Sequence, residues 1–116
     1  MTMRDLTSAE KYVIREVALR LPDGERDRLL EDMEHATAES HSVDGSRIAF
    51  SIAGYERPPY RGQHPFPVEG KVQDRDGSEL SVLLHADENG RLLELELVRF
   101  DEGGVVGPVW STLRLW

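Results

Sequence analysis

Apolar and polar residues alternate in three successive runs between residues 68 and 100. Two turn signals, Asp76-Gly77 and Asn89-Gly90, separate these runs. Period-two alternation between glycine-containing turns is typical of antiparallel strands joined by hairpins. We therefore predict a three-stranded antiparallel meander around which the rest of the chain is arranged.

The side chains also select the register of the second predicted hairpin, because a slip of one residue sends every side chain to the opposite face. Asn-Gly is the preferred sequence of a two-residue type I′ turn, and such a turn at Asn89-Gly90 aligns apolar residues. The aligned pairs are Ala86 with Leu93, Leu84 with Leu95 and Val82 with Leu97. On the other face, this register places His85 opposite Glu94.

The first hairpin requires a different turn. A two-residue turn at Asp76-Gly77 would bury Lys71 and Glu69, which costs several kcal/mol for each charge. A three-residue loop, 75–77, with Gly77 in a left-handed conformation aligns apolar residues instead. The predicted core face is Val68, Gly70, Val72, Leu80, Val82, Leu84, Ala86, Leu93, Leu95 and Leu97.

Helical periodicity replaces alternation in the N-terminal third. Thr7 and Glu10 have the spacing of a capping box, and apolar residues follow on one stripe to Leu21. After a break at residues 22–24, Asp23 is positioned to cap a second helix that runs to about Ala38. A polar loop at 40–46 and a strand at 47–52 come next.

Segment 54–67 contains four of the six prolines, which disfavour helix and central strand, so we predict a long loop. Such loops are often functional. Its candidate binding residues are Tyr55, Arg57, Tyr60, Arg61, His64 and Phe66. The structural alternative is that Tyr60 and Phe66 pack down as a lid over a sheet edge.

A final strand begins near Val109. Its alternation places Trp110 and Trp116 on the same side as Arg114, either as an interaction surface or as cover for a sheet edge. The pattern as a whole predicts one α+β domain. Two N-terminal helices, within residues 1–39, pack on one face of a four- to five-stranded antiparallel meander sheet, within residues 40–116.

Charge narrows the classes of function. The 116 residues include 22 acidic and 14 basic side chains, a net charge of −8, and no cysteine. Residues 69–102 alone carry −6, which disfavours nucleic acid and anionic membrane as partners and would steer a cationic partner. The alternative is that the charge only maintains solubility. Without an apolar leader or membrane-spanning stretch, we expect a cytoplasmic protein.

The face of the meander opposite the core carries the candidate chemistry. His85 lies beside Glu94 and Glu96 in the predicted register, with Glu69 and Glu79 on the same face. A histidine between carboxylates can act as an acid/base pair or as half of a metal site. More often it is a cross-strand polar pair, and no nucleophile accompanies it here. We therefore predict no catalytic residue, no metal and no cofactor.

Several segments resemble a family of small bacterial proteins with a domain of unknown function. They are the capped LTSAEK start, the GYERPPYRGQHPF loop, the doubled turn in DRDGSELSVLLHADENGRLLELELVRF, and the closing GPVWSTLRL. The resemblance implies no activity, cofactor or catalytic residue. In size, charge and fold it is similar to bacterial toxin-immunity proteins, which is an analogy rather than a result of spacing.

Two hypotheses follow. The first is a non-catalytic protein-binding module, such as an immunity protein that masks a basic partner, and the terminal strand also offers a homodimer contact. The second is a small enzyme or ligand-binding domain that uses His64, or His85 with Glu94 and Glu96, under the proline-rich loop.

Overall fold

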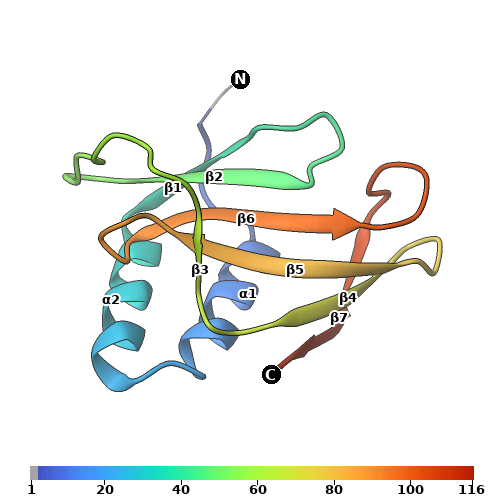
Figure 1. The fold of residues 1–116 in the computed structure, drawn as a ribbon, viewed down its shortest axis with the longest axis horizontal. Coiled ribbons are helices and arrows are strands. Elements are labelled where there is room, and N and C mark those ends of the chain that lie inside the picture. The colour runs from blue at the N-terminus through green and yellow to red at the C-terminus, as the bar shows by residue number, and fades with distance from the viewer. Residues whose placement is uncertain (1–2) are drawn as a thin grey trace.

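The computed structural model describes residues 3–116 and has an α+β architecture, with two helices behind a strongly twisted antiparallel sheet (Figure 1). The helices are α1 (Ser8–Ala18) and α2 (Asp23–Glu34). The strands are β1 (Ala36–Ser40), β2 (Arg47–Ile52), β3 (His64–Pro65), β4 (Gly70–Asp74), β5 (Glu79–Ala86), β6 (Leu92–Arg99) and β7 (Pro108–Leu115). Their order is β1-β2-β6-β5-β4-β7, and β3 pairs with β5. The prediction of four to five strands was therefore too low.

Helix α1 begins with the predicted capping box. The Thr7 hydroxyl accepts from Glu10 N at 3.1 Å, and the Glu10 carboxylate accepts from Thr7 N at 2.8 Å. Helix α2 differs from the prediction, because Pro22 is its N-cap and Asp23 is already its first residue. Neither helix, at 11 and 12 residues, is long and apolar enough to cross a membrane.

Strand β1 replaces the predicted end of the second helix. Helix α2 ends at Glu34 instead of continuing to about Ala38, and Ala36–Ser40 pairs along its whole length with β2. On the outer side of β1, Arg4 exchanges two backbone hydrogen bonds with Ala38. The sequence of β1 is a weak strand former, so its conformation comes from having a hydrogen-bonding partner on each side.

The first hairpin of the meander, β4–β5, has the predicted turn. Val72 pairs with Leu80 and Gly70 with Val82. Asp74 N donates to Ser78 O across the loop, and Gly77 has a φ of 93°. The alternating strands direct their apolar residues onto α1 and α2, where they form one buried core with both helices.

The second hairpin, β5–β6, has the predicted pairs Val82 with Leu97 and Leu84 with Leu95, but not the predicted turn. Its loop has three residues, 88–90, because the Asp87 carboxylate binds the backbone N–H groups of Asn89 and Arg91. The type I′ turn would need a positive φ at Asn89, and within residues 3–116 only glycines have one. Ala86 consequently pairs with Leu92 rather than Leu93. Leu93 is the extra residue of a β-bulge, and Leu92 is fully buried in its place.

The alternation of inward and outward side chains along β7 is interrupted part-way along the strand. Trp110 packs against the core, as do Leu113 and Leu115, whereas Val109 is exposed. The prediction that Trp110 shares a face with Trp116 and Arg114 is therefore wrong. The cause is an irregular register between β4 and β7, where the Thr112 hydroxyl accepts from Gln73 N and donates to Val109 O.

Candidate functional site

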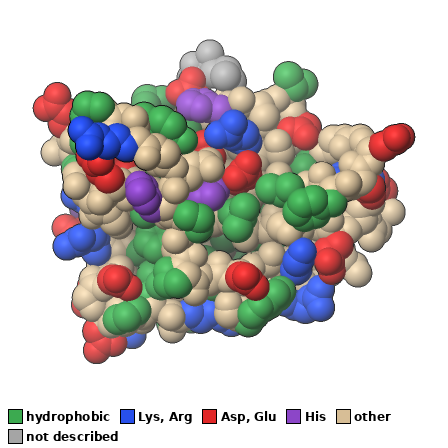
Figure 2. Space-filling model, viewed as in Figure 1, with side chains coloured by type: hydrophobic (Ala, Val, Ile, Leu, Met, Phe, Trp, Pro, Cys, Tyr) green, Lys and Arg blue, Asp and Glu red, His purple; other side chains and the backbone are tan. Residues whose placement is uncertain are grey.

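The outer face of the sheet, which is the face opposite the helices, is crossed by the proline-rich segment. Residues 54–63 form a loop and β3 continues it, so that the chain passes in front of β6 and β5 (Figure 1). The predicted loop of residues 54–67 thus contains a two-residue strand, in which His64 pairs with Ala86 and Pro65 with His85. Figure 2 shows histidine, acidic and basic side chains gathered at the upper left of this face.

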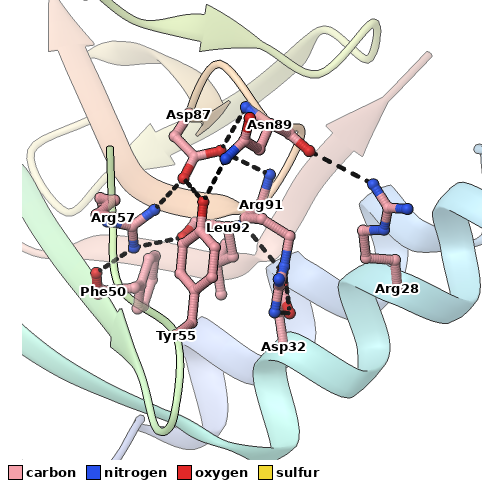
Figure 3. A network of polar contacts seen from close by, with 9 residues as sticks. All are labelled: Arg28, Asp32, Phe50, Tyr55, Arg57, Asp87, Asn89, Arg91 and Leu92. Atoms are coloured by element: carbon pink, nitrogen blue, oxygen red, sulfur yellow. Dashed lines mark hydrogen bonds and ion pairs between the residues drawn. The ribbon is translucent and has the colours of Figure 1, made fainter. Parts of the chain in front are cut away.

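Arg57 attaches loop 54–63 to the sheet at the place where β2 and β6 cease to pair. Pairing between β2 and β6 is confined to residues 47–49 and 94–96, because the bulge at Leu93 separates the strands beyond that point. The carbonyl groups of Phe50 and Leu92 face the gap, and Arg57 Nη2 donates to both at 2.8 Å (Figure 3). A guanidinium group satisfies two backbone acceptors that the sheet leaves unpaired.

Asp87 is the centre of the same network. Its Oδ2 accepts from the Tyr55 hydroxyl at 2.6 Å and from Arg57 Nη1 at 2.9 Å, while its Oδ1 binds the hairpin backbone (Figure 3). Burial by itself raises the pKa of the Asp87 carboxyl. The hydrogen bonds from Tyr55, from the backbone N–H groups of Arg91 and Asn89, and from Arg57 outweigh that effect and hold the pKa below its usual value.

Arg91 connects this network to helix α2. Its guanidinium forms a salt bridge with the buried Asp32 at 2.7 Å and lies 4.2 Å from the centre of the Tyr55 ring. Asp32 also accepts from Leu92 N at 3.1 Å. The helix, the hairpin and the base of the loop are therefore held in one arrangement (Figure 3).

The far end of loop 54–63 is also attached, whereas its tip is exposed. Gln63 Nε2 donates to Glu94 Oε1 at 2.6 Å on the outer face. Between the two attachments, the Tyr60 side chain is 72% exposed and Arg61 is exposed beside Glu88 at 3.7 Å. Phe66, in contrast, packs against the core. Phe66 thus packs down, as the lid interpretation expects, whereas Tyr60 does not.

His85, Glu94 and Glu96 form a cluster beneath this loop. His85 is the predicted partner of Glu94 in the β5–β6 register, but its Nε2 lies 3.0 Å from Glu96 Oε1. His85 is 3% exposed and Glu94 is 8% exposed. Glu94 is bound by Gln63 and by Arg47 Nη2, the latter at 3.2 Å.

Two clefts flank loop 54–63 and β3. One, of about 360 Å³, lies beside Glu94 and is lined by Glu39, His41, Arg57 and Tyr60 among others. The other, of about 280 Å³, lies between α2 and β3 and is lined by residues that include His64, Phe66 and Arg28. His64 and Glu94 therefore line different clefts, so the two alternatives of the ligand-binding hypothesis, His64 or His85 with Glu94 and Glu96, correspond to different places beside the loop.

Comparison with known proteins identifies the family. A profile for a domain of unknown function, DUF6984, matches residues 3–107. The chain belongs to the DUF6984 family. No curated protein and no solved structure matches the chain.

The DUF6984 match includes both helices, loop 54–63, the two hairpins of the meander and the His85 cluster, and it ends one residue before β7. The remaining predicted binding residues lie away from loop 54–63. Glu69 accepts from Trp116 Nε1 at 3.0 Å, and Glu79 forms a salt bridge with Arg114 of β7 at 3.1 Å. The structure thus divides the predicted residues between the loop and the β7 edge.

Asp87 and Asp32, the two carboxylates that hold the network together, were not predicted. A signal for Asp87 exists, because each hairpin has an aspartate three residues before its turn glycine, at Asp74 and Asp87. The carboxylates of both aspartates accept hydrogen bonds from backbone N–H groups of their loops. Asp32 has no comparable local signal, since its partner Arg91 is 59 residues away.

Proposed function

We propose that this DUF6984 protein is a non-catalytic protein-binding module that uses loop 54–63 and the adjoining outer face. The observation that carries the proposal is the attachment of this loop at Arg57 and Gln63, which leaves Tyr60 exposed between two fixed points. A tyrosine on an ordered loop offers a large contact area with little conformational entropy to lose on binding.

The surface charge supports a cationic partner. Among residues 3–116, five carboxylates are buried, and each forms a salt bridge with an arginine: Glu10 with Arg4, Asp32 with Arg91, Asp74 with Arg99, Asp87 with Arg57 and Glu94 with Arg47. Because these pairs are neutral, the net charge of −8 belongs to the other charged side chains, which are exposed or half-buried. Such a field accelerates association with a basic protein. In its most specific form, the proposal is a bacterial immunity protein that masks a basic toxin domain.

The experiment is affinity capture with the immobilised protein and two matched variants. Tyr60→Ala removes the exposed loop tyrosine, and Tyr12→Ala removes an exposed tyrosine on α1. We expect the wild type and Tyr12→Ala to retain the same partner, and Tyr60→Ala to retain at least about tenfold less. Capture should also decrease between about 0.05 M and about 0.5 M salt, as exposed charges are screened.

Equal capture by Tyr60→Ala and Tyr12→Ala would contradict the assignment of the binding surface to the loop. Capture that is independent of salt would contradict the cationic partner. A secreted-toxin gene next to the gene for this protein would support the immunity form of the proposal.

A second candidate function is small-ligand binding on the outer face. It is favoured by the burial of His85 and Glu94 next to the cleft of about 360 Å³, because a solvated flat face would have argued against it. Tyr60 lines that cleft, so a ligand there would be in contact with the loop proposed for protein binding.

A further inference from the structure

The His85 cluster has the composition and spacing of a metal site. His85 comes from β5, and Glu94 and Glu96 come from the outer side of β6. One potential ligand atom from each of the three residues lies within 4.8 Å of the others. Ligand atoms at roughly 2.0–2.2 Å from a tetrahedral Zn²⁺ are roughly 3.4 Å apart, so small side-chain rotations would bring these atoms to bonding distance.

Burial and hydrogen bonding distinguish this cluster from an ordinary acidic surface patch. Within the described chain, His85 Nδ1 is the one buried side-chain nitrogen or oxygen atom that has no hydrogen-bond partner. Buried polar atoms almost always have a partner, so the hydrogen bonding of the His85 ring is incomplete. Because Nε2 is the ring nitrogen that faces Glu96, an ion shared with the carboxylates would bind the lone pair of Nε2 in place of that hydrogen bond, with the ring proton on Nδ1.

The charges of the cluster also favour a cation. Two carboxylates face His85, and Arg47 is the cation that forms a salt bridge with one of them, Glu94. With a neutral imidazole, the negative charge of the half-buried Glu96 has no salt bridge with an arginine or lysine among the described residues. A divalent cation would offset that charge and replace the hydrogen bond between Nε2 and Glu96 with a bond to each of the two groups.

We propose that His85, Glu94 and Glu96 bind a divalent first-row transition-metal ion, with Zn²⁺ as the best match. One imidazole and two carboxylates suit Zn²⁺, whereas Mg²⁺ and Ca²⁺ prefer oxygen ligands alone. Three protein ligands leave a fourth coordination position for water or a ligand. An ion bound by Glu94 would compete for its carboxylate with the Gln63 side chain, which attaches the end of loop 54–63. The proposal does not rest on protein binding, and its failure would leave the Tyr60 experiment unaffected.

The test is Zn²⁺ titration of the untagged, chelator-treated full chain by calorimetry, with Co²⁺ absorption as a second readout. We expect one equivalent to bind, and Mg²⁺ not to displace it. His85→Asn should weaken Zn²⁺ binding at least about tenfold, because even the loss of a residue that only hydrogen-bonds a metal ligand weakens binding by that much. His64→Asn is the matched control, since His64 is an exposed histidine paired with the residue next to His85, and it should bind Zn²⁺ like the wild type.

Unchanged affinity in His85→Asn, or no one-to-one binding by the wild type, would overturn the proposal. If His85→Asn fails to fold by circular dichroism, Glu96→Gln provides the same test at a position that is only half-buried. Imidazole ¹⁵N shifts of the wild-type protein give a reading that needs no variant. One equivalent of Zn²⁺ should shift the His85 ring nitrogens, and a shift confined to other histidines would contradict the assignment.

Discussion

Buried carboxylates hold distant parts of this chain together. Asp74 accepts from the backbone N–H groups of Arg75, Val106 and Gly107 as well as from Arg99. Asp87 combines backbone, tyrosine and arginine donors in the same way. A buried carboxylate with a donor for each lone pair is tolerated, while removal of its charge weakens the hydrogen bonds that these donors form with it.

Asp87→Asn tests this role with little change in shape. We expect a loss of about 3 kcal/mol in the free energy of unfolding, because the buried pair with Arg57 is broken and two donors face an amide. Urea denaturation measures the loss. Glu88→Gln changes the adjacent, exposed carboxylate and should alter the free energy by less than about 0.5 kcal/mol. Similar losses in the two variants would mean that the Asp87 network contributes little to stability.

At the scale of elements, the two hairpins of the meander share one loop design. In each, an aspartate N–H donates across a three-residue loop to Ser78 O or Arg91 O, and a glycine with positive φ ends the loop. The hairpins differ in the strand that leaves the loop. After the second loop, β6 accommodates Leu93 as a bulge. Beyond this bulge β6 no longer pairs with β2, and Arg57 lies between the two strands.

Gly77→Ala tests the loop conformation directly. A Cβ at Gly77 meets nothing within 4 Å, so the cost comes from its φ of 93° alone, and we expect a loss of about 1 kcal/mol. Gly24→Ala is the matched control, because Gly24 is equally unobstructed but helical, and alanine should stabilise α2 by up to about 1 kcal/mol. Thermal or urea unfolding should show shifts of opposite sign. A stabilising Gly77→Ala would contradict the left-handed loop.

At the scale of the whole molecule, the buried carboxylates predict sensitivity to acid. Burial raises the pKa of Glu10, Asp74 and Asp87, but hydrogen bonds from arginines and backbone N–H groups outweigh it and leave each pKa below its usual value. The unfolded chain therefore takes up these protons at a higher pH than the folded chain does. The stability that these groups contribute is present above the ordinary carboxyl pKa of about 4 and is lost as the pH falls through the lower pKa values of the folded chain.

Urea unfolding at about pH 7 and about pH 3 measures this effect, and we expect a lower free energy of unfolding at the acidic pH. Asp87→Asn should show a smaller decrease between the two conditions, since one of the titrating groups is gone. A free energy that is constant or larger at about pH 3 would contradict the lowered pKa values.

Much of the core was predictable because its signals are local. The Thr7–Glu10 capping box, the strand at 47–52 and the β4–β5 register follow from spacing over a few residues. Within the candidate site, the same reasoning correctly placed His85 opposite Glu94. It did not predict that Glu96 is the residue in contact with His85, because the direction of a side chain depends on its neighbours.

The meander that dominates the sequence was therefore determined by the sequence itself, through alternation with a period of two and turn glycines at fixed positions. Tertiary structure decided the rest. Strand β1 required β2 as a partner, the Leu93 bulge depended on hydrogen bonds of Asp87, and the position of loop 54–63 depended on Phe50 and Leu92 carbonyls. The physical reason is distance along the chain. A pair such as Asp32 and Arg91, 59 residues apart, leaves no periodic trace in the sequence.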